Sequence, residues 1–76
     1  RQTGRVEEGI AAYERAIAMD PANILARSYY GQLLVQMDET RLAQAQLDAI
    51  RQAGGTGTWA ETALASAITT GVTYTY

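Results

Sequence analysis

The residues best placed for chemistry are the glycines of the run Gly54-Gly55-Thr56-Gly57-Thr58. A glycine-rich turn before a helix can cradle a phosphate group with its backbone amides. A P-loop, however, also needs a lysine in a G-x-x-x-x-G-K frame, and this sequence contains no lysine. We therefore interpret the run as a helix-to-helix linker, in which a glycine ends one helix and Thr58 caps the next.

The remaining polar residues offer no catalytic arrangement. The acids of Glu7-Glu8 and of Asp38-Glu39 diverge on a helix because they are sequence neighbours, so neither pair forms a facing dyad for acid–base work. Ser28 and Ser66 would need a histidine or lysine to activate them, and the sequence has neither. The absence of cysteine and histidine also removes disulfides, thiolates and zinc sites. We expect no enzyme activity, no metal and no cofactor.

Size and charge narrow the class of protein further. A chain of 76 residues can form one small domain, and its net charge of −2 disfavours binding to nucleic acid. No apolar stretch approaches the roughly 18 residues that suggest a membrane span. The sequence opens at Arg1 rather than at a methionine, so a signal peptide or upstream domain would lie outside it, and the compartment stays open. Hydrophobic residues make up 47%, with much alanine, which predicts an all-α protein.

Apolar periodicity divides the chain into helices. Val6, Ile10, Tyr13 and Ile17 recur at helical spacing and form one stripe. Similar stripes and their punctuation predict four helices, Arg5 to Met19, Ala22 to Met37, Glu39 to Ala53 and Trp59 to Thr70. The tail, residues 72–76, alternates like a strand and is interpreted as a frayed or edge-laid end.

Particular residues are expected at the helix ends and crossings. Asp20-Pro21 predicts a tight corner, because proline restricts the residue before it and suits the first turn of a helix. Asp38 is expected to cap the third helix, and Thr58-x-x-Glu61 matches a capping box for the fourth. Gly31 stands within the second helix, where it costs ~1 kcal/mol relative to alanine unless another backbone comes close. We interpret Gly31 as a helix-crossing point.

An internal repeat of about 34 residues links these helices. The shift places small or apolar residues on each other in both kinds of helix: Gly9 on Ala43, Tyr13 on Leu47, Ala16 on Ile50, Tyr30 on Leu64, Gly31 on Ala65 and Leu34 on Ile68. Two helices in each such period are typical of solenoids, in which a helix pair needs its neighbours to bury its core.

The stretch from Glu7 to Asn23 closely resembles the second helix of a tetratricopeptide repeat and its Asp-Pro corner. The residues that carry the resemblance are Gly9, Tyr13, Ala16 and Pro21, at the family's small, aromatic, small and proline positions. The next unit, residues 24–57, matches at Tyr30, Gly31, Leu34, Ala43 and Leu47. It departs at Arg27, where the family favours tryptophan, at Ile50, and at the glycine-rich corner.

The resemblance implies the organisation of the chain. It predicts an all-α fragment of a helical solenoid at the C-terminal end of an array: residues 4–23 as the second helix of one repeat and its corner, 24–57 as a full repeat, 58–71 as a capping helix and 72–76 as a tail. The alanine- and arginine-rich, lysine-free composition suggests a bacterial scaffold or assembly factor.

The resemblance also implies a protein-binding groove lined by the first helix of the full repeat. The residues expected to bind a partner there are Leu25, Ser28, Tyr29, Gln32 and Gln36. Tyrosine, glutamine and serine offer stacking and adaptable hydrogen bonds, which suits an extended peptide better than a charged ligand; the alternative is a merely solvated face. Relatives that grip a C-terminal carboxylate use lysine and asparagine, so that role is disfavoured. Tyr13, Tyr30 and Trp59 are expected in the core.

Two functions remain open. The first is a protein–protein interaction scaffold, and the second is a structural spacer or oligomerisation module without a peptide ligand. In the family's register the first helix lacks the helix that would precede it, so the stripe of Val6, Ile10, Tyr13 and Ile17 would stay partly uncovered. We expect the chain either to self-associate through this helix or to derive from a longer array.

Overall fold

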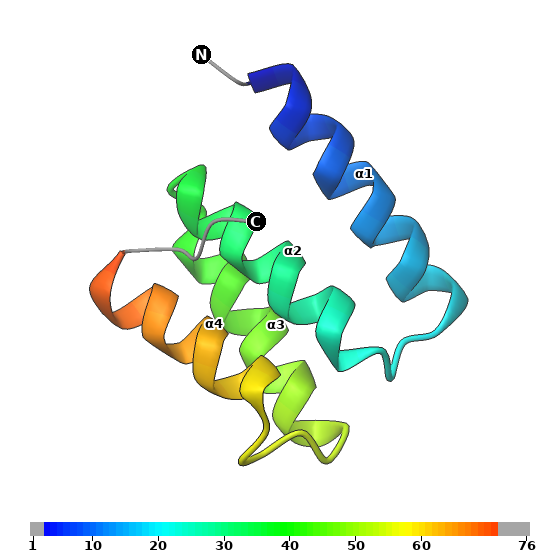
Figure 1. Ribbon diagram of the computed structural model, residues 1–76, viewed down its shortest axis with the longest axis vertical. Coiled ribbons are helices and arrows are strands. Elements are labelled where there is room, and N and C mark those ends of the chain that lie inside the picture. The colour runs from blue at the N-terminus through cyan, green and yellow to red at the C-terminus, as the bar shows by residue number, and fades with distance from the viewer. Residues whose placement is uncertain (1–2, 72–76) are drawn as a thin grey trace.

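The computed structural model describes residues 3–71, with side chains from residue 7 onward, and these residues form four helices without a strand (Figure 1). The helices are α1 (Thr3–Met19), α2 (Ile24–Gln36), α3 (Thr40–Gln52) and α4 (Trp59–Thr70). The all-α prediction with four helices is confirmed. The side chain of Val6 and the predicted alternating tail, 72–76, lie outside the described residues.

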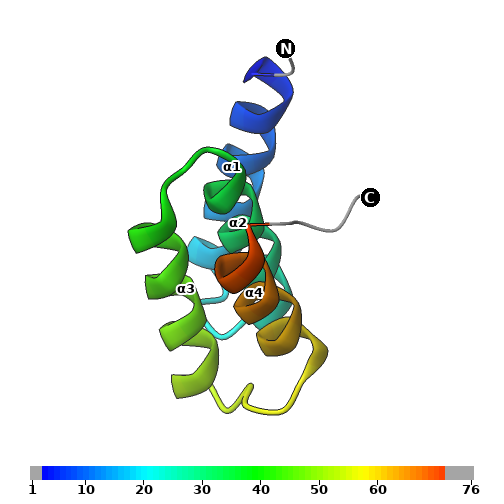
Figure 2. The same ribbon diagram turned by 90° about the vertical axis from the view of Figure 1, so that its left-hand side faces the viewer.

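The helices form two layers around α2. Consecutive helices run antiparallel, with α1, α2 and α4 side by side and α3 behind α2 and α4 (Figures 1 and 2). Helix α2 packs against each of the others, whereas the backbone of α1 approaches neither α3 nor α4. Helix α1 is therefore attached to the rest of the described chain through α2.

The core lies between α2, α3 and α4. Its centre consists of Leu47, Ile50 and Leu64, and small buried side chains let the helices approach closely; these are Ala26, Ala43, Ala60, Ala63 and Ala67. A Cβ atom on Gly31 would lie 2.6 Å from both Cδ atoms of Leu64. Gly31 thus marks the crossing of α2 and α4, although a buried leucine side chain, rather than a second backbone, occupies the space.

Helix α2 begins later than its sequence predicts. The side chain of Asp20 accepts a hydrogen bond from the Ala22 amide at 3.2 Å, which closes the Asp20-Pro21 corner. Asn23 then caps the helix, because its Oδ1 accepts from the Ala26 amide at 3.1 Å. Asparagine is among the best N-cap residues, and this cap moves the start from Ala22 to Ile24.

The turn between α2 and α3 corrects the role predicted for Asp38. Asp38 has a φ of 65° and makes no N-cap; Glu39 occupies that position without a side-chain hydrogen bond. The Asp38 amide instead donates to the Val35 carbonyl, and the Glu39 amide donates to Leu34 at 2.8 Å. These two bonds form a Schellman motif that ends α2, which requires the left-handed conformation at Asp38.

The glycine-rich linker ends α3 as predicted. Gly54 has a φ of 87° and its amide donates to the Arg51 carbonyl, while the Gly55 amide donates to Ile50 at 2.8 Å. This is a second Schellman motif. Gly55 is buried, and a Cβ atom there would lie 2.6 Å from Ile50 Cγ2. The linker is therefore shaped by helix termination and close packing.

Candidate interaction surface

The structure divides the five predicted partner-binding residues into two groups. Leu25 is 52% exposed, Gln36 is exposed and Tyr29 is half-buried, and their spacing places them on one face of α2. We call these three residues the α2 strip. Ser28 and Gln32, by contrast, are both 0% exposed. The prediction that they face an open groove is wrong.

Ser28 and Gln32 are linked by hydrogen bonds, and Ser28 is also bonded to the first turn of α4. Ser28 Oγ donates a hydrogen bond to the Ala60 carbonyl at 2.9 Å, and Gln32 Nε2 donates to Ser28 Oγ at 3.3 Å. Buried polar groups must find such partners, and none of the buried side-chain nitrogen or oxygen atoms described is left without one. Ser28 therefore joins α2 to α4, Gln32 supports Ser28 from within α2, and neither side chain is exposed to a partner in this structure.

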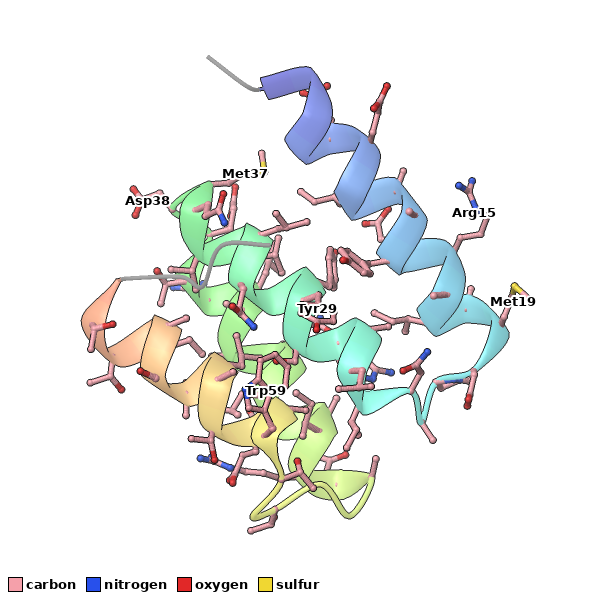
Figure 3. The ribbon with its side chains drawn as sticks, in the orientation of Figure 1. Arg15, Met19, Tyr29, Met37, Asp38 and Trp59 are labelled. Carbon is pink, nitrogen blue, oxygen red and sulfur yellow. The ribbon has the colours of Figure 1, made fainter. Side chains whose placement is uncertain are left out.

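Three aromatic rings from three helices form a continuous series. The ring centroids of Tyr13 on α1 and Tyr29 on α2 are 5.7 Å apart at an interplanar angle of 27°. Those of Tyr29 and Trp59 on α4 are also 5.7 Å apart, at 57°. Figure 3 shows Tyr29 and Trp59 on the same side of the molecule. We call Tyr13, Tyr29 and Trp59 the aromatic ladder.

Trp59 is the surface residue that the sequence reasoning missed. It was predicted in the core, yet it is 50% exposed. The 34-residue shift contains the signal that could have found it, because that shift places Trp59 on Leu25, a residue of the predicted stripe. A half-exposed tryptophan in contact with a half-buried tyrosine is the composition typical of an interface anchor.

The first turn of α4 is fixed by several hydrogen bonds. The Glu61 amide donates to Thr58 Oγ1 at 3.4 Å, as expected for a capping box. The Glu61 carboxylate, however, accepts from the Gly57 amide at 2.9 Å rather than from Thr58. It also accepts from Arg51 Nε at 2.8 Å. These contacts tie the linker, α3 and α4 together directly beside Trp59.

The same contacts show whether the backbone amides of the glycine-rich run are available to bind a phosphate. The Gly57 amide, which a phosphate would need, already binds the carboxylate of Glu61. The hydrogen bond from Gly57 and the pairing with Arg51 hold the pKa of the Glu61 carboxyl below its usual value of 4.5. The geometry agrees with the linker interpretation of residues 54–58.

Helix α1 is tied to α2 by a polar contact beside the ladder. Tyr30 Oη donates a hydrogen bond to Glu14 Oε2 at 3.0 Å. Partial burial, followed by the bond to Glu14 and its negative charge, raises the pKa of the Tyr30 phenol above 10.0. Tyr13 and Tyr30 are half-buried between the helices rather than enclosed in a core.

Arg27 replaces a tryptophan that the predicted repeat pattern favours, and it has a clear structural role. Its Nε donates to the Pro21 carbonyl at 2.8 Å, and its Nη1 donates to Gln46 Oε1 at 2.9 Å. The guanidinium therefore joins the corner before α2 to α3 by hydrogen bonds where an aromatic ring would do so by packing.

Other kinds of site find no support among the described residues. Their acidic side chains nowhere gather in a group of three that could hold a metal ion. None of the four helices is long and apolar enough to cross a bilayer. The feature of the described surface that stands out is the α2 strip together with the ring of Trp59.

A family model described as Tetratricopeptide repeat matches residues 1–67. No match was found among curated proteins or among solved structures. The match spans α1, α2, α3 and most of α4, so it covers both helix pairs related by the 34-residue shift.

Proposed function

Because this chain belongs to the tetratricopeptide repeat family, whose repeats generally mediate protein–protein interaction, we propose that it binds a partner segment across the α2 strip and Trp59. The observation that carries the proposal is the half-exposed Trp59 ring, which meets Tyr29 on a face built from uncharged residues. The family is generally a non-catalytic interaction repeat, which agrees with a binding role.

The dimensions of the α2 strip suit a short extended peptide. Leu25 and Gln36 are eleven positions apart in the sequence, which corresponds to ~16 Å along a helix. An extended peptide of about five residues spans that length. Leu25, Tyr29 and Trp59 provide apolar and aromatic surface, and Gln36 is an uncharged residue at the far end. This combination supports recognition of a peptide without charge.

Ser28 and Gln32 take a different part in the proposed function. Gln32 donates to Ser28, and Ser28 donates to the Ala60 carbonyl; this buried chain of bonds supports the contact of α2 with α4. That contact brings Trp59 against Tyr29. We propose that they position the binding surface without touching the ligand.

A second candidate function is self-association through α1. Ile10, Tyr13 and Ile17 are each only partly buried, and the backbone of α1 approaches α2 alone among the described helices. A partly covered apolar stripe favours an interface with another helix, which agrees with the oligomerisation alternative. This function uses a surface different from the α2 strip, so the two can be tested separately.

The proposed binding surface can be tested with displayed random peptides selected on the purified chain. Affinities of the selected peptides would then be measured for the wild type, for Trp59→Ala and for the control Leu42→Ala. Leu42 is 49% exposed on α3, so it matches Trp59 in exposure but lies on another helix. We expect Trp59→Ala to cost ~2 kcal/mol of binding free energy, as aromatic anchors do, and Leu42→Ala to cost nothing measurable. Peptides insensitive to Trp59→Ala would overturn the proposal.

A further inference from the structure

We infer that the partner segment is uncharged and proline-bearing, and that it docks on the aromatic ladder in a polyproline II conformation; this inference rests on the proposed function. The ladder brings together rings from α1, α2 and α4, and the Trp59 ring at its end is half-exposed. Proline-rich segments are recognised by surfaces lined with aromatic side chains, because the flat pyrrolidine ring packs on an aromatic face and the segment is already extended.

The rings are ordered before any ligand arrives. Tyr29 is held between Tyr13 on one side and Trp59 on the other, each at 5.7 Å. Trp59 stands at the first position of α4, which is fixed by the Thr58 and Glu61 contacts. Little rotamer freedom is left to lose on binding, and such pre-organisation favours a ligand that is itself stiff.

The electrostatics of the surface favour a neutral segment. Glu61, next to the first turn of α4, is already paired with Arg51 and the Gly57 amide, and Glu14 accepts a hydrogen bond from the Tyr30 phenol. The α2 strip itself contains no charged residue. A negatively charged ligand would lose its hydration here without gaining an opposite charge, whereas an uncharged one would not.

Trp59 also offers the hydrogen-bond donor that such a segment needs. A polyproline II segment makes no internal hydrogen bonds, so its carbonyl groups remain available as acceptors. The indole N–H of Trp59 makes no hydrogen bond with another described residue, and the side chain is half-exposed. It can therefore donate to a ligand carbonyl while the ring packs against proline.

The length of the ladder agrees with the polyproline II repeat. Two successive steps of 5.7 Å place the outer rings at most about 11 Å apart, and one polyproline II turn of three residues rises about 9 Å. Prolines three residues apart can thus face Tyr13 and Trp59 together. The single proline of these 76 residues, Pro21, stands in the α1–α2 corner with its carbonyl bound to Arg27, so it is not the docking segment. We propose that a partner protein supplies the segment.

The test uses the fluorescence of Trp59, the single tryptophan of the chain. The probe is a capped, uncharged peptide of alanine, threonine and proline with proline at every third position. Its controls replace the prolines with glycine, or the threonines with aspartate. We expect the proline peptide to change Trp59 emission saturably and to bind about tenfold more tightly than either control. Equal binding of the glycine peptide, or tighter binding of the aspartate peptide, would overturn the inference.

Variants examined by calorimetry locate the binding. Trp59→Leu and Tyr29→Leu keep an apolar side chain but remove an aromatic face, so each should weaken the proline peptide about tenfold, while Leu42→Ala should not. Circular dichroism establishes that each variant is folded. If Tyr29→Leu does not fold, the affinity of Trp59→Leu for the proline peptide still tests the inference, because Trp59 is half-exposed in the first turn of α4. Unchanged affinity in a folded Trp59→Leu protein contradicts the inference.

The remaining outcomes separate this inference from the proposed function. Displayed peptides that require Trp59 but carry no proline would leave the proposed function standing and overturn the proline assignment. Trp59 emission that changes with protein concentration alone would identify a second copy as the occupant of the ladder. Emission that changes when residues 72–76 are removed, with the proline peptide still unbound, would identify the tail. Either result overturns the inference.

Discussion

Ser28 and Ala60 are 32 residues apart in sequence and are joined by a hydrogen bond of 2.9 Å from the serine hydroxyl to the alanine carbonyl. Both residues are buried, at the contact of α2 with the first turn of α4. The bond sets the position of that turn, and the turn presents Trp59 to Tyr29. The Ser28 hydroxyl, which the sequence predicts in a binding groove, thus supports the helix packing behind the aromatic ladder.

Ser28→Ala should destabilise the fold because it removes the donor to Ala60 and the acceptor of Gln32 Nε2 together. Losing these two hydrogen bonds within the buried contact should cost ~1–3 kcal/mol. Ser66→Ala on α4 is the matched control, since Ser66 is only half-buried, and its effect should stay within ~0.5 kcal/mol. Urea unfolding measures both, and equal effects of the two substitutions would contradict the role assigned to Ser28.

Gly31→Ala and Gly9→Ala should have opposite effects on stability. At Gly31 a Cβ atom would lie 2.6 Å from Leu64, a fully buried side chain, so overpacking of ~1–3 kcal/mol exceeds the gain in helix propensity of ~1 kcal/mol. At Gly9 the nearest atom is Leu33 Cδ1 at 3.1 Å, where a small shift suffices. We expect Gly31→Ala to lower the melting temperature and Gly9→Ala to leave it equal or higher. A stabilising Gly31→Ala would argue against the close crossing of α2 and α4.

The stability of the chain should depend on pH through Glu61. The Gly57 amide and then Arg51 lower the pKa of this carboxyl below 4.5 in the folded chain. The contribution of Glu61 to the free energy of unfolding is therefore complete above about pH 4.5, the pKa of this carboxyl in the unfolded chain. It is lost as the pH falls through the lower pKa that the carboxyl has in the folded chain. Glu61→Gln should flatten the fall in unfolding free energy below pH 4.5, and the control Glu8→Gln, an exposed acid on α1, should not. An identical acid profile for wild type and Glu61→Gln would refute this.

Association through α1 should be visible in sedimentation at micromolar concentration. We expect a dimer that Ile10→Glu dissociates, because Ile10 belongs to the partly buried stripe of α1. Ala11→Glu adds the same charge at an exposed neighbour and should leave the dimer intact. Circular dichroism controls for unfolding of Ile10→Glu. A wild-type chain that sediments as a monomer would remove self-association from the candidate functions.

Local patterns in this sequence predict much of the fold. The 3.6-residue periodicity located four helices. Gly54 ends α3 and Thr58 caps α4 as predicted because these conformations depend on near neighbours, although the Glu61 carboxylate binds the Gly57 amide instead of completing the capping box. The N-cap role predicted for Asp38 was wrong because local chemistry allows this residue more than one role. An aspartate can serve as an N-cap or adopt the left-handed conformation, and the sequence alone does not choose between them.

The interaction surface depended on contacts between distant segments. Helical spacing correctly put Leu25, Ser28 and Tyr29 near one face of α2, but spacing cannot tell whether another helix covers part of that face. Ser28 is bonded to α4, Gln32 is enclosed with it, and Trp59 stays half-exposed beside Tyr29. Burial is a property of the assembled helices, so the tertiary structure alone decided that Ser28 and Gln32 are enclosed and that Trp59 stays half-exposed.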